Sequence, residues 1–317
     1  MDGVRGSAVL VATDRQRLSD MTFLDGRETF WSSQTLVPIR LAPCTGPPMS
    51  RFVFHAGFCG STLLARLLGL SGDALVLKEP QCLADIAGQR ELIVSGRAIA
   101  SLDALLDYAL CKLDEAGDTG RLVVVKPTNW VNSLLPQLCH PKRGVRAVFL
   151  GMDRRSFTRA VFRGNRARIE FSIRLAAQLA AIVPDGEKIL VAAIAQDDNP
   201  LDRAARIAGL LHAFQERLFE QMIATNGWSD EVRITLDDLV QRPEATLRRT
   251  RMVLGLAQQD NAPQRAALMM SRNAKDPLIR FHPADRHQED REMERHHGVR
   301  FDAALDWVDS YYPSAPD

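Results

Sequence analysis

The sequence lacks any apolar run that approaches the ~20 consecutive residues needed to span a bilayer. The apolar run at 8–12 is also much shorter than the hydrophobic core of a signal peptide. We therefore expect a soluble protein with no membrane partner.

Cysteine pairs with CxxC spacing are also absent. An odd number of scattered thiols in a chain of this size is typical of reduced cysteines in the cytoplasm. We expect a cytoplasmic protein with no disulfide and no zinc site. The His-His-Gly sequence at 296–298 lacks the spacing of a zinc helix such as HExxH, so we expect no metal. The cysteines are Cys44, Cys59, Cys82, Cys111 and Cys139.

An excess of charge of one sign is missing too. The chain has 40 Lys and Arg residues against 39 Asp and Glu residues, a net charge of +1 at pH 7. This balance excludes the strongly basic surface with which proteins attract nucleic acids, so we expect no nucleic-acid partner. Any binding site for an anion must be local.

The sequence does contain short apolar runs that alternate with helical patterns. With 317 residues and 46% apolar content, the chain has enough apolar surface for a sizeable core. The alternation predicts an α/β fold of three layers, in which helices cover both faces of a central parallel sheet. The expected strands are 52–54, 74–77, 122–125, 146–150 and 232–236, with 188–194 as a possible further strand. The expected helices are 61–70, 83–93, 102–116, 166–182, 201–224 and 243–254.

Residues 1–50 precede this alternation and end in a Pro-rich stretch. We interpret them as an N-terminal extension that packs on the core, and residues 51–317 as one P-loop domain. That domain includes a C-terminal lid or tail. The segment FHPADR, with His282 and Arg286, is the candidate lid, and the alternative is a solvated surface tail.

A Gly-rich turn lies between an apolar strand and an apolar helix at 51–68, RFVFHAGFCGSTLLARLL. Gly57 and Gly60 allow the backbone to turn sharply. Ser61 and Thr62 offer hydroxyl and N–H groups where the helix dipole favours an anion. Gly60 stands where a Walker A sequence has its Lys, which disfavours an ATPase or GTPase. The predicted phosphate cradle consists of Gly57, Phe58, Cys59, Gly60, Ser61 and Thr62.

Charged side chains follow two of the predicted strands. Lys78 and Glu79 end one strand, and Lys126 ends another. Ligands bind beyond the carboxyl ends of parallel strands, so these side chains are expected to face the cradle. We interpret Glu79 as a general base for a hydroxyl or amine, with Lys78 and Lys126 as catalytic cations. The alternative is an ordinary ion pair at a strand end.

Arg154 and Arg155 open a basic segment directly after another predicted strand. Guanidinium groups pair well with phosphate oxygens, so we expect at least one of the two to bind a second phosphate of the cofactor. The alternative is a basic solvent face on a helix, because Arg155, Arg159 and Arg163 recur at four-residue spacing.

Residues 51–256 resemble the P-loop sulfotransferases, which use 3'-phosphoadenosine 5'-phosphosulfate (PAPS). GFCGST is similar to their 5'-phosphosulfate loop, and VRITLDDLVQRPEATLRRTRMVLGL at 232–256 is similar to their late strand, acidic turn and helix. LKEP and KPT resemble their Lys-Glu and Lys-Thr-Pro elements. The resemblance implies a sulfotransferase-like P-loop fold, PAPS as the donor and a small-molecule or carbohydrate acceptor. It also implies that Glu79 is the base and that Lys126 acts on the substrate side.

The chain departs from the family pattern at three positions. Phe58 stands where the family loop has Lys or Arg. Met152 and Ala160 stand where the family has the Arg and Ser that bind the 3'-phosphate. Three interpretations stay open: a PAPS-dependent sulfotransferase with relocated cations, a transferase that uses another phosphorylated donor for phosphoryl or nucleotidyl transfer, and a catalytically silent nucleotide-binding scaffold.

Overall fold

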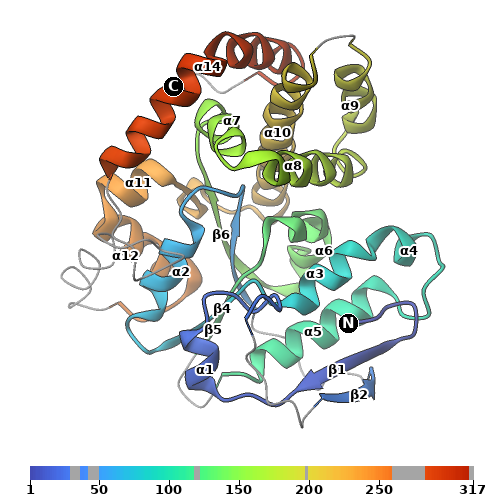
Figure 1. The fold of residues 1–317 in the computed structure, drawn as a ribbon. Coiled ribbons are helices and arrows are strands. Elements are labelled where there is room, and N and C mark those ends of the chain that lie inside the picture. The colour runs from blue at the N-terminus through green and yellow to red at the C-terminus, as the bar shows by residue number, and fades with distance from the viewer. Residues whose placement is uncertain (29–35, 42–49, 118–121, 197–198, 259–282, 314–317) are drawn as a thin grey trace.

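The computed structural model describes residues 1–28, 36–41, 50–117, 122–196, 199–258 and 283–313. A five-stranded parallel sheet with the strand order β4-β5-β3-β6-β7 lies at its centre (Figure 1). The predicted parallel sheet is therefore confirmed. Its strands are β3 (Arg51–His55), β4 (Ala74–Lys78), β5 (Leu122–Lys126), β6 (Arg146–Gly151) and β7 (Arg233–Thr235).

The central strands are apolar on both faces. Every residue of β3 and of β4 is buried. The ring of Phe54 stacks on Phe52 at 4.9 Å and on Phe149 of β6 at 5.8 Å between centroids. Such runs lack the alternation of a half-exposed strand, because helices cover both faces of the sheet.

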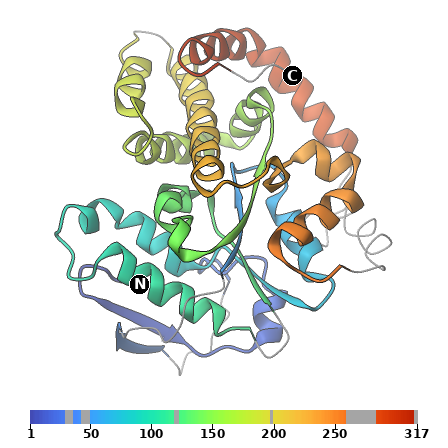
Figure 2. The same ribbon diagram turned by 180° about the vertical axis from the view of Figure 1, so that it is seen from behind.

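Figures 1 and 2 show helices on both sides of the sheet from opposite views. On one side lie α2 (Ser61–Gly69) and α12 (Pro243–Leu254), and on the other lie α3 (Gln81–Gly88), α5 (Leu102–Asp114) and α6 (Leu135–Leu138). This arrangement confirms the three-layer α/β fold. Shorter elements are α4 (Arg90–Val94), α11 (Leu236–Gln241), η1 (Asn129–Leu134), η2 (Pro141–Arg143) and η3 (Asp230–Val232).

A second group of helices packs together beside the carboxyl end of β6 (Figure 1). The C-terminal helix packs along α7 and α10 (Figure 1). It thereby brings the end of the chain beside residues near its middle. The group consists of α7 (Arg154–Phe162), α8 (Asn165–Ala180), α9 (Gly186–Ile194), α10 (Pro200–Asn226) and α14 (Pro283–Asp309).

The possible strand at 188–194 is wrong, because this segment forms α9. Ile189, Leu190 and Ala193 are buried, whereas Val191 is 65% exposed. That pattern has the spacing of one helix face. Periodicity alone does not separate a short apolar run in a strand from one in a helix.

The N-terminal residues pack against the edge strand of the sheet. They form β1 (Ser7–Val11), α1 (Arg15–Asp20) and β2 (Leu36–Arg40), with β1 and β2 antiparallel. Leu24 donates its N–H to the Lys78 carbonyl at 2.7 Å and accepts from the Gln81 N–H at 3.0 Å. These two backbone hydrogen bonds fix residues near 24 at the carboxyl end of β4.

The expectation of reduced cysteines throughout is wrong at one position. Cys111 on α5 is disulfide-bonded, and its partner lies outside the described residues. Cys59, Cys82 and Cys139 are free. Disulfide pairing depends on the distance between two Cα atoms in the folded chain, which sequence spacing does not reveal.

Candidate functional site

The Gly-rich turn between β3 and α2 has an unusual backbone. Gly57 and Gly60 have φ angles of 98° and 81°, in the region that favours glycine. Phe58 between them has a φ of 60°, although it carries a side chain. Strained backbone of this kind costs of order 1–3 kcal/mol and concentrates at functional sites.

Neighbouring side chains also leave little room for a Cβ at Gly57 and at Gly60. A Cβ on Gly57 would lie 2.7 Å from Nδ2 of Asn129, and a Cβ on Gly60 would lie 2.9 Å from Cδ1 of Leu236. The loop backbone is thus held against η1 on one side and α11 on the other.

The N-terminus of α2 is open to a ligand. Its first backbone hydrogen bond runs from the Leu64 N–H to the Gly60 carbonyl at 3.0 Å, so the preceding N–H groups have no carbonyl within the helix. Gly60 provides no side-chain cap. Ser61 and Thr62 occupy the first turn, and neither hydroxyl has a hydrogen-bond partner among the described residues. The turn can therefore offer several donors to one anion.

Cys59 of the loop is a structural residue. It is fully buried, and its thiol donates to the Leu150 carbonyl at 3.3 Å. Burial raises the pKa of the thiol to about 11, with the nearby charge of Lys126 as a smaller, opposing cause. The Cys59 thiol therefore stays protonated at neutral pH.

Glu79 and Lys126 form an ion pair at the carboxyl ends of two adjacent strands. The Glu79 N–H also donates to the Lys126 carbonyl at 2.6 Å. The Glu79 side chain is 13% exposed and that of Lys126 only 2%. Glu79 has a φ of 58°, so it is the second strained residue of this region. The structure thus brings together Glu79 and Lys126, two of the three strand-end residues to which the sequence pointed.

Backbone contacts connect this pair to the loop. His55, which ends β3, contacts the Pro127 carbonyl through Nε2 at 2.9 Å. Asn129 donates from Nδ2 to the Ala56 carbonyl at 3.1 Å. The residues after Lys126 therefore run directly beside the start of the turn.

Arg27 and Phe23 also lie beside the Glu79–Lys126 pair, although no local sequence pattern points to them. Arg27 donates to the second carboxylate oxygen of Glu79 at 2.9 Å, and its guanidinium lies 3.9 Å from the centroid of the Phe23 ring. The Lys126 ammonium lies 5.8 Å from the same ring. The Arg27 side chain is 56% exposed and also pairs with Asp25.

Lys78 has a different environment from Lys126. Its ammonium donates to the Ser19 carbonyl at 2.8 Å and forms no ion pair with Glu79 within the described ranges. Burial, with the charge of Arg66 as a smaller cause, lowers the pKa of Lys78 from 10.5 to about 8. Lys78 therefore holds the N-terminal segment on the sheet.

Replacing Lys78 with Met should change how stability depends on pH. The Lys78 pKa is about 8 in the folded protein and about 10.4 in an unfolded chain. The unfolded chain binds more protons between these values, so the wild type gains stability as pH rises through this window. We expect a gain of about 2 kcal/mol relative to K78M between about pH 7.5 and pH 9.5. Denaturant unfolding at both pH values measures it, and a constant difference would contradict the lowered pKa.

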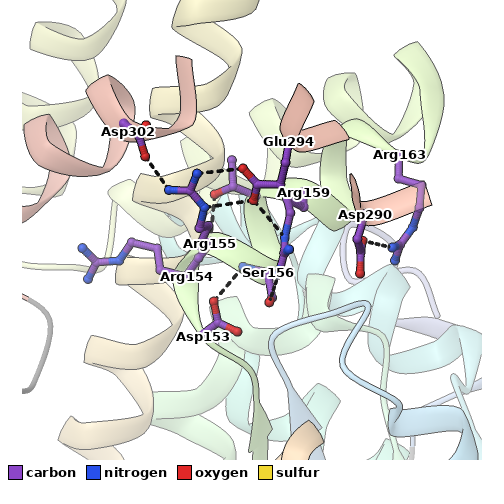
Figure 3. Close-up of polar contacts among 10 residues, drawn as sticks. Asp153, Arg154, Arg155, Ser156, Arg159, Arg163, Asp290, Glu294 and Asp302 are labelled. Atoms are coloured by element: carbon purple, nitrogen blue, oxygen red, sulfur yellow. Dashed lines mark hydrogen bonds and ion pairs between the residues drawn. The ribbon is translucent and has the colours of Figure 1, made fainter. Parts of the chain in front are cut away.

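The structure places Arg154 and Arg155 against α14 (Figure 3). Arg155 donates to both carboxylate oxygens of Glu294, at 2.9 Å and 2.7 Å, and also pairs with Asp302. Arg154 pairs with Asp309. The basic-face alternative thus describes the spacing correctly, but this face is covered by an acidic helix instead of solvent.

Two further arginines extend this contact, which we call the α7–α14 ladder. Arg159 lies 3.5 Å from a carboxylate oxygen of Glu294. Arg163 pairs with Asp290 and lies 3.5 Å from a carboxylate oxygen of Glu289. Successive turns of α7 therefore meet successive carboxylates of α14 (Figure 3).

The ladder should make stability sensitive to salt. Replacing Asp290, Glu294 and Asp302 together with their amides is expected to cost about 2 kcal/mol at low ionic strength, because such pairs are partly exposed. The cost should shrink at about 0.5 M NaCl, where screening weakens the pairs. Thermal melts of both proteins at two salt concentrations test this. A salt-independent difference would show that packing, not charge, holds α14.

The three departures from the family pattern have ordinary surroundings. Phe58 packs on Phe157 with ring centroids 5.9 Å apart. Met152 and Ala160 are buried, and the Met152 carbonyl contacts Nε2 of His212 at 2.7 Å. Burial lowers the pKa of His212 below its ordinary value. No formal charge is supplied by these three side chains.

Other expectations are only partly addressed by the described residues. Within them, no group of three or more His, Cys, Asp or Glu side chains is arranged to hold a metal ion. No helix of this part of the chain is long and apolar enough to cross a membrane. His282 of the candidate lid lies outside the described residues, and Arg286 is in α14 without a described side chain. The rings of Tyr312 and Phe214 pack edge to face, with their centroids 5.8 Å apart.

Comparison with known proteins gives little beyond this geometry. No protein-family model matches the chain, and no curated protein matches it. Among solved structures, it is similar to one titled "Sulfotransferase Domain from the Curacin Biosynthetic Pathway", with a TM-score of 0.40 and 15% sequence identity. The match covers 81% of this chain and 99% of that one. Such a distant likeness does not identify a donor or an acceptor, so the functional proposal depends on this chain's own residues.

Proposed function

We propose that this chain is a PAPS-dependent sulfotransferase that acts on a hydroxyl or amine of a small-molecule or carbohydrate acceptor, with no metal and in the cytoplasm. The observation that carries the proposal is the Glu79–Lys126 pair beside the open N-terminus of α2. An anion cradle and a carboxylate in one site suit transfer of a charged group to a protonated acceptor.

The loop fits a phosphorylated donor. Its two glycines leave no room for a Cβ against Asn129 or Leu236, and its helix N-terminus has unpaired N–H groups. The residues from Gly57 to Thr62 would hold the 5'-phosphosulfate end. When bound, the donor supplies the sulfuryl group, whose bond to the phosphate oxygen breaks as the acceptor's oxygen or nitrogen bonds to sulfur, with the electron pair passing to the phosphate.

Glu79 accepts the proton that the acceptor loses. Its carboxylate oxygens each have one cationic donor, Lys126 and Arg27, and each can accept a further hydrogen bond. The buried Lys126 keeps the carboxylate oriented, while the exposed Arg27 can move aside. Lys126 also carries a positive charge directly before the residues that contact the start of the loop, and this charge would offset the negative charge that develops on the leaving phosphate.

Phe58 favours a second candidate function. An apolar ring supplies no charge at the position where the sulfotransferase loop has its cation. A transferase that uses another phosphorylated donor, for phosphoryl or nucleotidyl transfer, fits the same cradle and the same base.

Calorimetric titration with adenosine 3',5'-bisphosphate tests the proposal, beside ATP, ADP and inorganic sulfate. We expect selective binding of the bisphosphate, weakened in a Ser61→Ala, Thr62→Ala double variant and unchanged in the control Ser229→Ala, whose exposed side chain caps nothing. Preferential binding of ATP would support the second function. Absence of nucleotide binding would support a silent scaffold. Intact affinity in the double variant would show that the two hydroxyls are structural.

A further inference from the structure

Arg168 of α8 reaches the phosphate loop from outside the sequence motifs. The centre of its guanidinium lies 4.6 Å from the centroid of the Phe58 ring. Phe58 stands where the sulfotransferase pattern has a cationic loop residue. The guanidinium of Arg168 therefore lies beside Phe58, although the two residues are far apart in the sequence.

The same guanidinium touches a second departure from the pattern. Nη1 of Arg168 donates to the Ala160 carbonyl at 2.6 Å. Ala160 stands where the pattern has the Ser that binds the 3'-phosphate. One side chain therefore lies between two positions at which the sequence has lost an anion ligand.

Arg168 differs from the arginines of α7 in its partners. Arg154, Arg155, Arg159 and Arg163 all have carboxylates of α14 within ion-pair distance. Arg168 has no carboxylate at that distance among the residues that the structure describes, and its one hydrogen bond there leaves most of its five N–H donors unused. A partly buried cation whose N–H donors are mostly unused is a favourable ligand for an anion.

We propose that Arg168 binds the oxyanion of the donor held over the loop, in place of the cation missing at Phe58. The inference rests on the proposed function, and it specifies which side chain supplies the charge. Arg168 recognises phosphate or sulfate oxygens through N–H donors, while stacking on the Phe58 ring holds the guanidinium plane.

Gly164 allows this placement and provides a sharp test of it. A Cβ at residue 164 would lie 1.8 Å from Nε of Arg168 and 2.1 Å from Cζ. The backbone of Gly164 has a φ of −94°, outside the positive-φ region that favours glycine, so the backbone itself allows alanine there. Because the clash falls on the end of a flexible side chain, Gly164→Ala should displace the guanidinium while the charge and the fold remain.

The experiment is titration of the full chain with adenosine 3',5'-bisphosphate and with pyrophosphate. The variants are Arg168→Met, Arg168→Lys and Gly164→Ala, and the control is Arg166→Gln. Arg166 lies on the same helix, with a side chain that is 92% exposed. We expect affinity for both ligands to fall about 10- to 100-fold in R168M and G164A, to fall less in R168K and to stay unchanged in R166Q.

The outcomes separate this inference from the proposed function. Equal affinity of R168M and the wild type for both ligands would overturn the role of Arg168 and leave the donor proposal standing. Binding of pyrophosphate alone, dependent on Arg168, would support the role of Arg168 and overturn the donor. Absence of binding of either ligand to the wild type would overturn both. Thermal melts of each variant distinguish lost binding from lost folding.

Discussion

Replacing Glu79 with glutamine is expected to lower turnover by about 10²- to 10⁴-fold, the usual contribution of a general base. The amide keeps the shape of the side chain but does not accept the acceptor's proton. Affinity for the nucleotide should stay nearly unchanged, because the loop and the N-terminus of α2 are untouched. Release of adenosine 3',5'-bisphosphate from the donor measures turnover, and calorimetry measures affinity.

A control is needed because Glu79→Gln leaves the buried ammonium of Lys126 without its counterion. The double variant Glu79→Gln, Lys126→Met removes both charges and should recover most of the lost stability. If Glu79 is the base, the double variant folds well and stays inactive. Turnover close to that of the wild type in either variant would remove Glu79 from the mechanism.

Replacing Lys126 alone with methionine is expected to lower the free energy of unfolding by about 3 kcal/mol. Glu79 would then keep only Arg27 as a partner, and the Arg27 side chain is 56% exposed. The control is Lys112→Met, which breaks the surface pair with Glu115 on α5 and should cost less than about 1 kcal/mol. Urea denaturation of the two variants gives both values.

The double-mutant cycle of Glu79 and Lys126 measures the interaction energy between the two side chains. Each single variant leaves one buried charge behind, whereas the double variant leaves none. We therefore expect the two single losses to sum to far more than the loss in the double variant. Additive losses would mean that the two groups do not interact in solution.

Much of the fold was predictable because its strands are buried on both faces. Continuous apolar runs such as those of β3 and β4 are distinctive in sequence. The run at 188–194 was not predictable, because a short apolar stretch fits a helix as well as a strand. The pairing of Cys111 was equally hidden, since it depends on distances in the folded chain.

The candidate site also contains some residues that were predictable from the sequence and others that were not. Glu79 and Lys126 were predictable as neighbours because parallel strands end at one edge of the sheet. Arg27 comes from a segment with no regular pattern, and a backbone contact between Leu24 and Lys78 places it. The partners of Arg155 lie 139 and 147 residues away, too far for a local pattern to show. The positive φ of Glu79 also has no signature in its neighbours.

The helices α7 and α14 are in contact in the structure but far apart in the sequence, so they are synthesised at different times. The ribosome makes Arg155 139 residues before Glu294, an interval on the order of 10 s at ordinary rates of synthesis. Throughout that interval the emerging chain presents a row of guanidinium groups that the finished protein neutralises. Before α14 is made, this face is more cationic than in the folded protein, and the polyanionic ribosomal RNA can attract it at short range. Emergence of α14 therefore changes the charge of one face of the protein.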